Sequence, residues 1–573
     1  MPSILLQPVR TVVLVCMVAL AGCRTEVPAQ APPGSDWDEY VRGFLDSYFH
    51  NNPTFAVALG RHEFDGRLPD WSEKGLEAWK SRLHFVRNIV STFPLAASDT
   101  ARRFEREYLL SRIDRDLFWL DRADWPHRNP EYYSGTLDPN VYLTREYAPL
   151  ADRMRAFTRY ATNLPGALEQ MRANLHTPMP RAYAQIAIGR FGGLASYLKD
   201  DVPKVFASVG DSGVRQGFES ANARAVAALE KTAAWFTAQE KQGTDAYALG
   251  PELFSEMLRM TEGIDEPLDS LEARGRRDMD RNLAALREAC GKFAPGASVA
   301  ACVARMNAHK SSLPPVETAR HQLDTLEAFV RSKDLVSVPG MERARVEMSP
   351  PYQRFNFAYI DTPGPFEKGL PATYYIAPAD PSWPKAEQDE YIPGVANLLF
   401  ASVHEVWPGH FLQFMHSKRV HSTIGRVFED YAFAEGWAHY AEEMMWEAGL
   451  GNGDPEVHIG ELANALLRDA RYLSAIGLHT RGMTIAESEK LFLEKAYNNP
   501  GNARQQALRG TYDPGYLNYT LGKLMIRKLR DDWTSTRGGR KAWREFHDRF
   551  LSFGDPPIPL VRKAMLGDDR GVL

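Results

Sequence analysis

Hydrophobic residues recur at three- and four-residue spacing along most of the chain, which is the pattern of amphipathic helices. The first example runs from Trp37 to Tyr48, where aromatic and aliphatic side chains fall on one face. The same pattern predicts further helices over residues 74–92, 101–120, 150–164, 167–175, 213–241, 252–261, 268–290, 316–332, 455–473 and 484–495. We interpret their apolar stripes as core packing, so the fold is predicted to be mainly α.

The pattern changes between Pro339 and Pro393, where prolines are frequent and β-favouring residues gather in short runs. Short strands are predicted over residues 343–348, 354–360 and 372–377. An exposed edge strand can hold an extended peptide by strand addition. Tyr374 and Tyr375, in the last of these runs, are therefore candidate substrate-binding residues. An ordinary hairpin that packs on helices explains the run equally well.

Two histidines and a carboxylate follow the apolar run 395–401, in the order His404, Glu405 and His410. Zinc peptidase helices commonly carry His-Glu-x-x-His, because residues i and i+4 share a helix face and both imidazoles reach one metal. The wider spacing here would turn His410 roughly 120° away on a regular helix. Pro408-Gly409 can end or kink the helix and return His410 to the ion. The motif predicts a metal site; two packed or solvated histidines near a helix end are the alternative.

A helical segment downstream, residues 431–443, carries Glu435 among apolar and aromatic neighbours. A buried carboxylate costs several kcal/mol unless it is paired or bound to a metal. Because a second helix supplies the third ligand in one large class of zinc peptidases, Glu435 is the expected third ligand. His439 and Glu442 lie one to two turns further along and suit supporting positions behind the ligands.

Two groups near the C-terminus are candidates for catalysis. His479 follows a glycine at an expected helix end, and Tyr519 lies in a tyrosine-rich stretch after the turn at residues 513–515. Either group could donate a hydrogen bond to an oxyanion beside the metal. Nothing local places them there, and isolated residues of these types are more often structural.

The N-terminus predicts a lipoprotein. Arg10 precedes an apolar stretch that is too short to span a membrane, and Leu-Ala-Gly-Cys at residues 20–23 resembles a bacterial lipobox. We expect removal of residues 1–22, lipid attachment to Cys23 and a flexible tether over residues 23–35. Arg24 in place of an aspartate favours the outer membrane, facing the periplasm. Secretion without a lipid is the alternative.

Composition and cysteine usage limit the partners. The chain has 573 residues, of which 44% are hydrophobic and 25% charged, as in soluble globular proteins. Its net charge of −5 argues against nucleic acid as a partner, and no later apolar run reaches membrane-spanning length. Cys290 and Cys302 enclose a short loop, so a disulfide is predicted in an oxidising periplasm.

Several of these stretches together resemble the domain of unknown function 885 family, a group of bacterial, often lipoprotein, zinc-peptidase-like proteins. The likeness runs through nearly all of the mature chain and is carried by residues 59–65, 249–254, 404–410, 435–438, 477–479 and 514–522. The resemblance implies a mainly helical metallopeptidase architecture, broadly similar to the thimet oligopeptidase and carboxypeptidase Taq groups. It also implies His404, His410 and Glu435 as metal ligands and Glu405 as the catalytic carboxylate. Ala475 stands where the family often has an acidic residue, which weakens a role for His479.

The sequence thus predicts a zinc-dependent hydrolase, a cell-envelope peptidase acting on a peptide or related amide. Its large multi-helix domain is expected over residues 36–573, with the metal-site core at about 340–525 and a small β-sheet next to the metal-site helix. Glu405 would accept the proton of the attacking water and pass it to the leaving amine. The alternatives are a zinc amidase acting on a cell-wall or small-molecule amide, and a non-catalytic envelope lipoprotein of the same fold.

Overall fold

The computed structural model describes residues 36–350, 357–379, 384–568 and 571–573. The predicted signal peptide, the lipidation site Cys23 and the tether lie outside the described residues. The described chain has two large hydrophobic cores. One core belongs to residues 37–236, joined by residues 424–428, and the other mainly to residues 254–573. We refer to the two parts as the N-terminal lobe and the C-terminal lobe.

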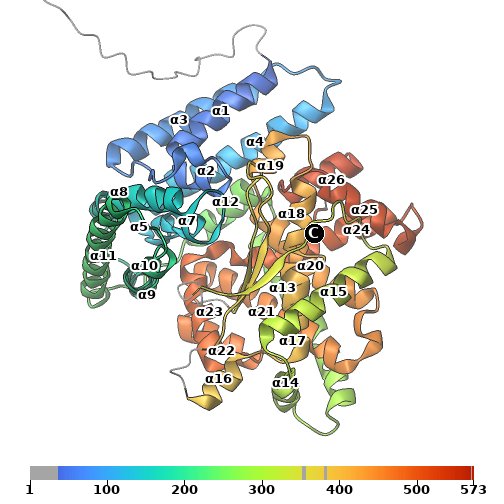
Figure 1. The fold of residues 1–573 in the computed structure, drawn as a ribbon. Helices are drawn as coiled ribbons and strands as arrows, with labels where there is room; N and C mark the ends of the chain where they lie inside the picture. The colour runs from blue at the N-terminus through green and yellow to red at the C-terminus, as the bar shows by residue number, and fades with distance from the viewer. Residues whose placement is uncertain (1–35, 351–356, 380–383, 569–570) are drawn as a thin grey trace, which may run out of the picture.

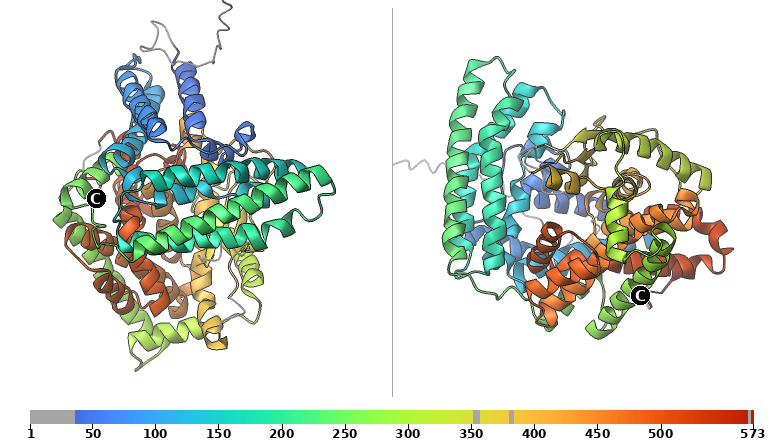
Figure 2. Two further views of the ribbon diagram at one scale, coloured as in Figure 1. Left: turned by 90° about the vertical axis from the view of Figure 1, so that its left-hand side faces the viewer. Right: turned by 90° about the horizontal axis from the view of Figure 1, so that it is seen from below.

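The N-terminal lobe is helical throughout. The helices α1 to α4 lie at the top of Figure 1, and the long helices α8, α9 and α11 pack together at its left, as the side view in Figure 2 also shows. The helices of this lobe are α1 (Trp37–Asn51), α2 (Pro53–Ala58), α3 (Glu73–Thr92), α4 (Thr100–Leu117), α5 (Trp125–Arg128), α6 (Glu131–Ser134), α7 (Asn140–Thr144), α8 (Leu150–Asn174), α9 (Arg181–Asp200), α10 (Val202–Val205) and α11 (Ser212–Glu240).

Most of the predicted helices are present, and the mainly α fold class is confirmed. Two of the predicted helices are one in the structure, because α8 continues through Pro165. The pattern also missed several helices, of which α9 and α23 are the longest. The helix α9 is rich in alanine and glycine, and its apolar stripe is weak for that reason; the helix α23 is short of large apolar residues.

The remaining helices surround the predicted metal-site motif and belong to the C-terminal lobe, except that α19 packs into the core of the N-terminal lobe. They are α12 (Pro251–Glu262), α13 (Leu268–Phe293), α14 (Val299–Ala308), α15 (Pro315–Lys333), α16 (Lys385–Tyr391), α17 (Val395–Glu405), α18 (His410–Ser417), α19 (Thr423–Val427), α20 (Tyr431–Glu447), α21 (Pro455–Thr480), α22 (Ile485–Glu494), α23 (Pro500–Tyr512), α24 (Asn518–Thr534), α25 (Trp543–Leu551) and α26 (Ile558–Leu566).

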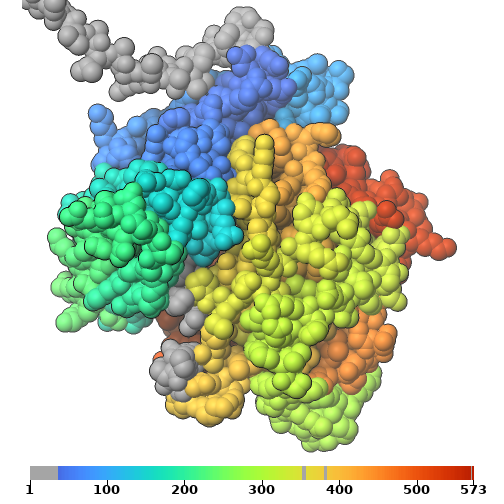
Figure 3. Space-filling view, viewed as in Figure 1, coloured from blue at the N-terminus to red at the C-terminus, as the bar shows by residue number. Residues whose placement is uncertain are grey.

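A three-stranded sheet stands beside these helices, formed by β1 (Arg345–Met348), β2 (Ala358–Asp361) and β3 (Thr373–Ile376) in the order β1-β3-β2. The strand β3 pairs parallel with β1 and antiparallel with β2, so it is the central strand. The expectation that residues 372–377 form a substrate-binding edge is therefore wrong, since both sides of β3 are paired. In Figure 3 the yellow segment that carries the sheet forms a ridge between the blue-green N-terminal lobe and the rest of the C-terminal lobe.

The edge strand β2 is tied to the N-terminal lobe by Arg145. Its guanidinium lies 2.7 Å from Asp361, the last residue of β2, and 3.0 Å from Glu367. The same side chain donates to the backbone oxygen of Ala58 at the end of α2. A largely buried arginine with two carboxylate partners fixes the position of this strand relative to the lobe that faces it.

Two glycines allow α20 and α24 to cross with their backbones in contact. A Cβ atom at Gly436 would lie 2.5 Å from the Cα of Gly522, and one at Gly522 would lie 2.0 Å from the backbone oxygen of Ala432. No other residue fits at either position without separating the helices. Glu435 and Tyr519, which flank this crossing, are consequently brought together.

None of the helices among the described residues is both long and apolar enough to cross a membrane. Cys290 and Cys302 form a disulfide that joins α13 to α14 across a separation of 12 residues. Both cysteines are buried in the core of the C-terminal lobe.

Removing this disulfide should destabilise the protein without changing its fold. Closing a loop of this length restricts the unfolded chain, so a Cys290→Ala, Cys302→Ala variant should lose about 3 kcal/mol of unfolding free energy. Denaturant unfolding of both proteins, with and without reductant, measures this loss. Reductant should destabilise the wild type alone; equal sensitivity of the two proteins would contradict the prediction.

Candidate metal centre

The two histidines of the motif lie on different helices, because α17 ends at Glu405 and α18 begins at His410. Gly409 makes the break possible: its N–H donates to the oxygen of Val403 at 3.0 Å, and a Cβ there would lie 1.8 Å from the backbone oxygen of His404. The buried indole of Trp437 on α20 donates to the oxygen of Pro408 at 2.9 Å. The predicted interruption at Pro408-Gly409 is thus present, and it is anchored to the helix that carries Glu435.

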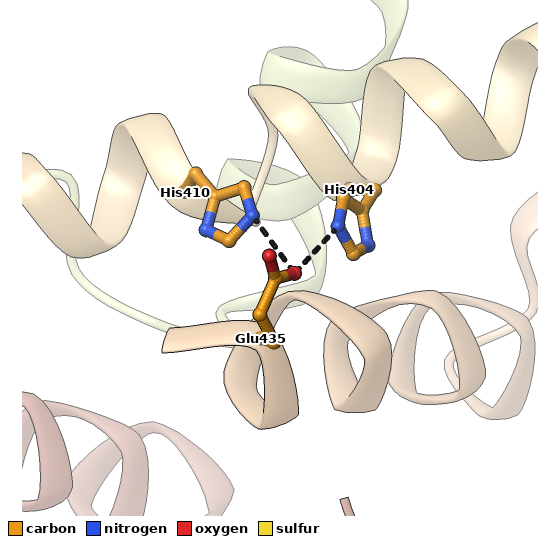
Figure 4. Close-up of side chains that lie close together, drawn as sticks. All are labelled: His404, His410 and Glu435. Atoms are coloured by element: carbon orange, nitrogen blue, oxygen red, sulfur yellow. Dashed lines mark ion pairs between the residues drawn. The ribbon is translucent and has the colours of Figure 1, made fainter. Parts of the chain in front are cut away.

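The three predicted ligands converge (Figure 4). Nε2 of His404 lies 3.3 Å from Oε2 of Glu435, and Nε2 of His410 lies 3.4 Å from the same oxygen. Their possible ligand atoms all lie within 4.8 Å of one another, and among the described residues this is the one such His, Cys, Asp and Glu group. The break in the motif therefore turns His410 back toward His404, whose ring centroid is 4.8 Å away.

The spacing of these atoms suits a metal ion better than direct hydrogen bonds. Oε2 of Glu435 is buried and has no hydrogen-bond partner among the described residues, and both N···O separations exceed the usual N–H···O range. Ligand atoms at about 2.0 to 2.1 Å from one tetrahedral zinc ion would lie about 3.3 to 3.4 Å apart. Two imidazoles and a carboxylate are also a common catalytic zinc ligand set.

Protons and a metal would compete for this site. Burial acts to lower the pKa of His410, but its contact with Glu435 outweighs burial and raises that pKa to about 9. Burial acts to raise the pKa of Glu435, while the two imidazoles hold it well below its usual range. At neutral pH the metal-free site is therefore an imidazolium–carboxylate pair, and a metal must displace the proton of His410 to bind.

A buried chain of contacts orients His404 from behind. Its Nδ1 lies 2.7 Å from Oε1 of Glu442, which also lies 3.0 Å from the Arg468 guanidinium. The guanidinium is 3.2 Å from Nδ1 as well; since Nδ1 donates to Glu442, we take the arginine to be paired with the carboxylate. His439 contacts the other oxygen of Glu442 at 3.4 Å. Glu442 thus directs Nε2 of His404 toward Glu435, as expected for groups behind a ligand.

Arg468 accounts for the charge of Glu442 in the protein interior. Burial acts to raise the pKa of this carboxyl, but the arginine and the two histidines hold it well below its usual range. The carboxylate therefore stays ionised and keeps Nδ1 of His404 protonated, which leaves Nε2 as the free lone pair for a metal.

Tyr519 reaches the site by donating its phenolic O–H to Oε1 of Glu435 at 2.9 Å. This bond occupies one carboxylate oxygen and leaves the other, Oε2, facing the imidazoles. In this structure the phenol orients a ligand. The predicted oxyanion role would require it to release Glu435.

A cavity of about 1610 Å³ opens onto the metal centre and is lined by His404, Glu405, His410, Glu435 and Tyr519 among others. The edge strand β2 also lines the cavity with Ala358, Tyr359 and Ile360. Glu405 ends α17 directly after the ligand His404, so its carboxylate is available on the cavity wall beside the imidazoles.

The structure does not bring His479 to the metal centre. This histidine is buried where α12, α21 and α23 meet; its Nε2 donates to the oxygen of Gly510 at 2.7 Å and its Nδ1 accepts from the N–H of Leu249 at 3.2 Å. Burial lowers its pKa to about 4. Both ring nitrogens are engaged in packing the helices, so the catalytic role predicted for His479 is withdrawn.

Tyr374 and Tyr375 do not line the cavity. Tyr374 is fully buried in the central strand, and the ring of Tyr375 stacks on that of Tyr359 at 5.1 Å. The substrate-binding role predicted for this pair is wrong because the strand between the tyrosines and the cavity is β2. The sequence of the strands alone could not give their order in the sheet.

Three arginines near the centre were not singled out from the sequence. Arg468 and Arg471 lie on α21 and Arg509 on α23, and all three face the ring of Tyr519, with guanidinium carbons 4.7 to 5.9 Å from its centroid. A signal existed. Arg468 and Arg471 are three residues apart in a strongly apolar helical segment, which places two charges on one otherwise buried face.

A side chain at Gly409 should damage the metal centre more than the fold. In Gly409→Ala the added methyl cannot occupy its place against His404, so α18 must shift and carry His410 away. We expect zinc affinity to fall by about tenfold or more, as for other changes that misorient a ligand. Chelator competition measures this affinity. Gly166→Ala, in α8 where a Cβ meets nothing, is the matched control and should bind zinc as the wild type does; equal affinity in all three proteins would refute the positional role of Gly409.

Comparison with known proteins places the chain in a family. No curated protein matches it. A solved structure of a candidate lipoprotein of unknown function from Shewanella oneidensis superposes with a TM-score of 0.76 at 22% identity, covering 93% of this chain and 100% of the other. A candidate lipoprotein from Colwellia psychrerythraea gives 0.78 at 15% identity, over 93% and 99%. The sequence matches the family described as "Bacterial protein of unknown function (DUF885)" over residues 53–565, and the chain belongs to that family, as the motifs had indicated.

Proposed function

We propose that the protein is a zinc-dependent peptidase of the bacterial cell envelope. The observation that carries the proposal is the convergence of His404 and His410 on the unpartnered Oε2 of Glu435, at separations that suit tetrahedral zinc. The intact set of two imidazoles and two carboxylates disfavours a non-catalytic role.

The residues around this centre have complementary roles. A zinc ion held by His404, His410 and Glu435 would polarise the scissile carbonyl and lower the pKa of water toward about 7. Glu405 would accept the proton of the attacking water and deliver it to the departing amine nitrogen, which balances the protons over the hydrolysis. Tyr519 and Glu442 would hold a ligand each in the required orientation.

The form of the cavity favours a peptide as substrate. Its volume of about 1610 Å³ exceeds that of most small-molecule sites, and an edge strand forms part of its wall. In the sheet, β2 pairs with β3 on one side only. The N–H and C=O groups on its other side could pair with an extended peptide. This is the strand-addition mode anticipated from the sequence, with β2 in place of β3.

The N-terminal sequence supports the proposed location. Residues 20–23 read Leu-Ala-Gly-Cys after a short apolar stretch, and two solved structures similar in fold come from candidate lipoproteins. Attachment by a lipid on Cys23 would keep the catalytic domain in the envelope, with the outer membrane as the proposed site.

Two conservative substitutions should separate metal binding from chemistry. Glu405→Gln should retain zinc and lose activity by about 100- to 10,000-fold, since an amide cannot accept the water proton. Glu435→Gln should lose zinc affinity, and activity with it, because a neutral amide oxygen is a poor zinc ligand. Metal analysis of the purified proteins and a peptide-library digest followed by mass spectrometry measure both quantities.

Glu390→Gln, which changes another carboxylate of the cavity wall, is the matched control and should keep zinc and activity. Full activity in Glu405→Gln would remove the proposed base. Full zinc occupancy in Glu435→Gln would show that Glu435 is not a zinc ligand.

Lipid attachment can be tested independently of activity. Cys23→Ser should leave the protein in the soluble periplasmic fraction or stall its processing, because serine cannot carry the thioether lipid. Fractionation of cells that produce each form gives the result. Unchanged membrane association of a Cys23→Ser protein from which residues 1–22 have been removed would disprove the anchor.

A further inference from the structure

Arg471 is a buried cation that pairs with no carboxylate of the described residues. Its side chain projects from α21 into the cavity wall and only 8% of the residue is exposed. The neighbouring arginines are neutralised, Arg468 by Glu442 at 3.0 Å and Arg509 by Asp513 at 2.9 Å. In the part of the chain that the structure describes, no carboxylate oxygen lies within 4.0 Å of the Arg471 nitrogens.

The guanidinium of Arg471 is held in place, but most of its N–H groups have no hydrogen-bond acceptor among the described residues. Its Nε donates to Oε1 of Gln506 at 2.8 Å, and its carbon lies 4.7 Å from the centre of the Tyr519 ring. A guanidinium has five N–H donors, so four remain for a ligand. Burial of a charge without a counter-ion is costly. An anion in the cavity would relieve this cost.

The position of Arg471 relative to the metal centre limits what that anion can be. The hydroxyl of Tyr519 contacts Glu435 at 2.9 Å, and the face of the same ring contacts Arg471. One tyrosine side chain therefore separates the guanidinium from a metal ligand. One or two extended residues, at about 3.5 Å each, bridge a gap of that size.

We propose that Arg471 binds the C-terminal carboxylate of the substrate, so that the enzyme is a carboxypeptidase that releases one or two residues. The inference rests on the proposed peptidase function and adds its substrate class. Arginine pairs with a carboxylate through two parallel hydrogen bonds, which fixes the chain end as well as its charge. A peptide held in this way presents its last or second-last peptide bond to the metal and Glu405.

The same wall supplies groups for the peptide itself. From α23, Asn502, Gln505 and Gln506 line the cavity beside Arg471, and Oδ1 of Asn502 is buried without a partner among the described residues. Carboxamides both donate and accept, as the N–H and C=O groups of a short peptide require. The cavity therefore has an anion-binding end at α21 and α23 and a metal at the other side of Tyr519.

The test compares an N-acetylated hexapeptide that ends in a free carboxylate with the same peptide ending in an amide. The wild type should release one or two residues from the acid and favour it over the amide in kcat/KM by about 10- to 100-fold, as expected for hydrogen bonds to a charged group. Arg471→Gln should abolish this preference mainly by raising KM for the acid. Arg471→Lys should keep part of it.

Lys310→Gln is the matched control, since it removes another cation of the cavity wall and should leave the acid-to-amide ratio as in the wild type. Binding of both peptides to the Glu405→Gln protein, measured by calorimetry, gives a readout without turnover. Tighter binding of the acid that depends on Arg471 supports the inference even if hydrolysis fails, which would count against the peptidase proposal alone. Equal binding of acid and amide, or cleavage within the peptide at acidic side chains, would overturn it.

Discussion

The candidate metal centre depends on the close approach of backbones at glycine positions. Gly409 lies against the last turn of α17, where a methyl group would meet the oxygen of His404, and Gly436 lies against Gly522 where α20 crosses α24. The first contact lets the two histidines leave one helix and enter another while both face Glu435. The second brings the phenol of Tyr519 within hydrogen-bond distance of that carboxylate. Together they place groups from three helices around one point.

The charges behind the ligands complete the arrangement that these contacts begin. Glu442 fixes which nitrogen of His404 is available, and Arg468 keeps the buried Glu442 ionised. Trp437 anchors the loop between the histidines to the helix that supplies both Glu435 and Glu442. The three candidate ligands are thus held in place without a metal, which would limit the reorganisation that metal binding requires.

The sequence predicted those parts of the site that are local in the chain. The spacing from His404 to His410 demanded a break, and Pro408-Gly409 supplied the residues for one; Glu435 was notable as a carboxylate in an apolar helix. The remaining groups are set by packing between distant segments. The sequence near Tyr374 did not show that β2 would pair with the outer side of β3. The sequence near His479 did not show that its two ring nitrogens would hydrogen-bond to Gly510 and Leu249. Long-range pairing of this kind is not encoded in a local pattern of polar and apolar residues.

The helix α21 shows how one face can serve two purposes. Arg468 and Arg471 are three residues apart and lie on the same side of the helix, and both lie near the ring of Tyr519. Arg468 forms an ion pair with Glu442, the carboxylate that orients His404. Arg471, one turn further along the helix, is out of reach of that carboxylate. A buried guanidinium requires an anion, and none of the described residues places a carboxylate beside Arg471. We therefore infer that its partner comes from the cavity. If the proposed function holds, this difference between two neighbouring arginines would orient a bound peptide, with its cleaved bond at the metal and its C-terminal carboxylate at Arg471.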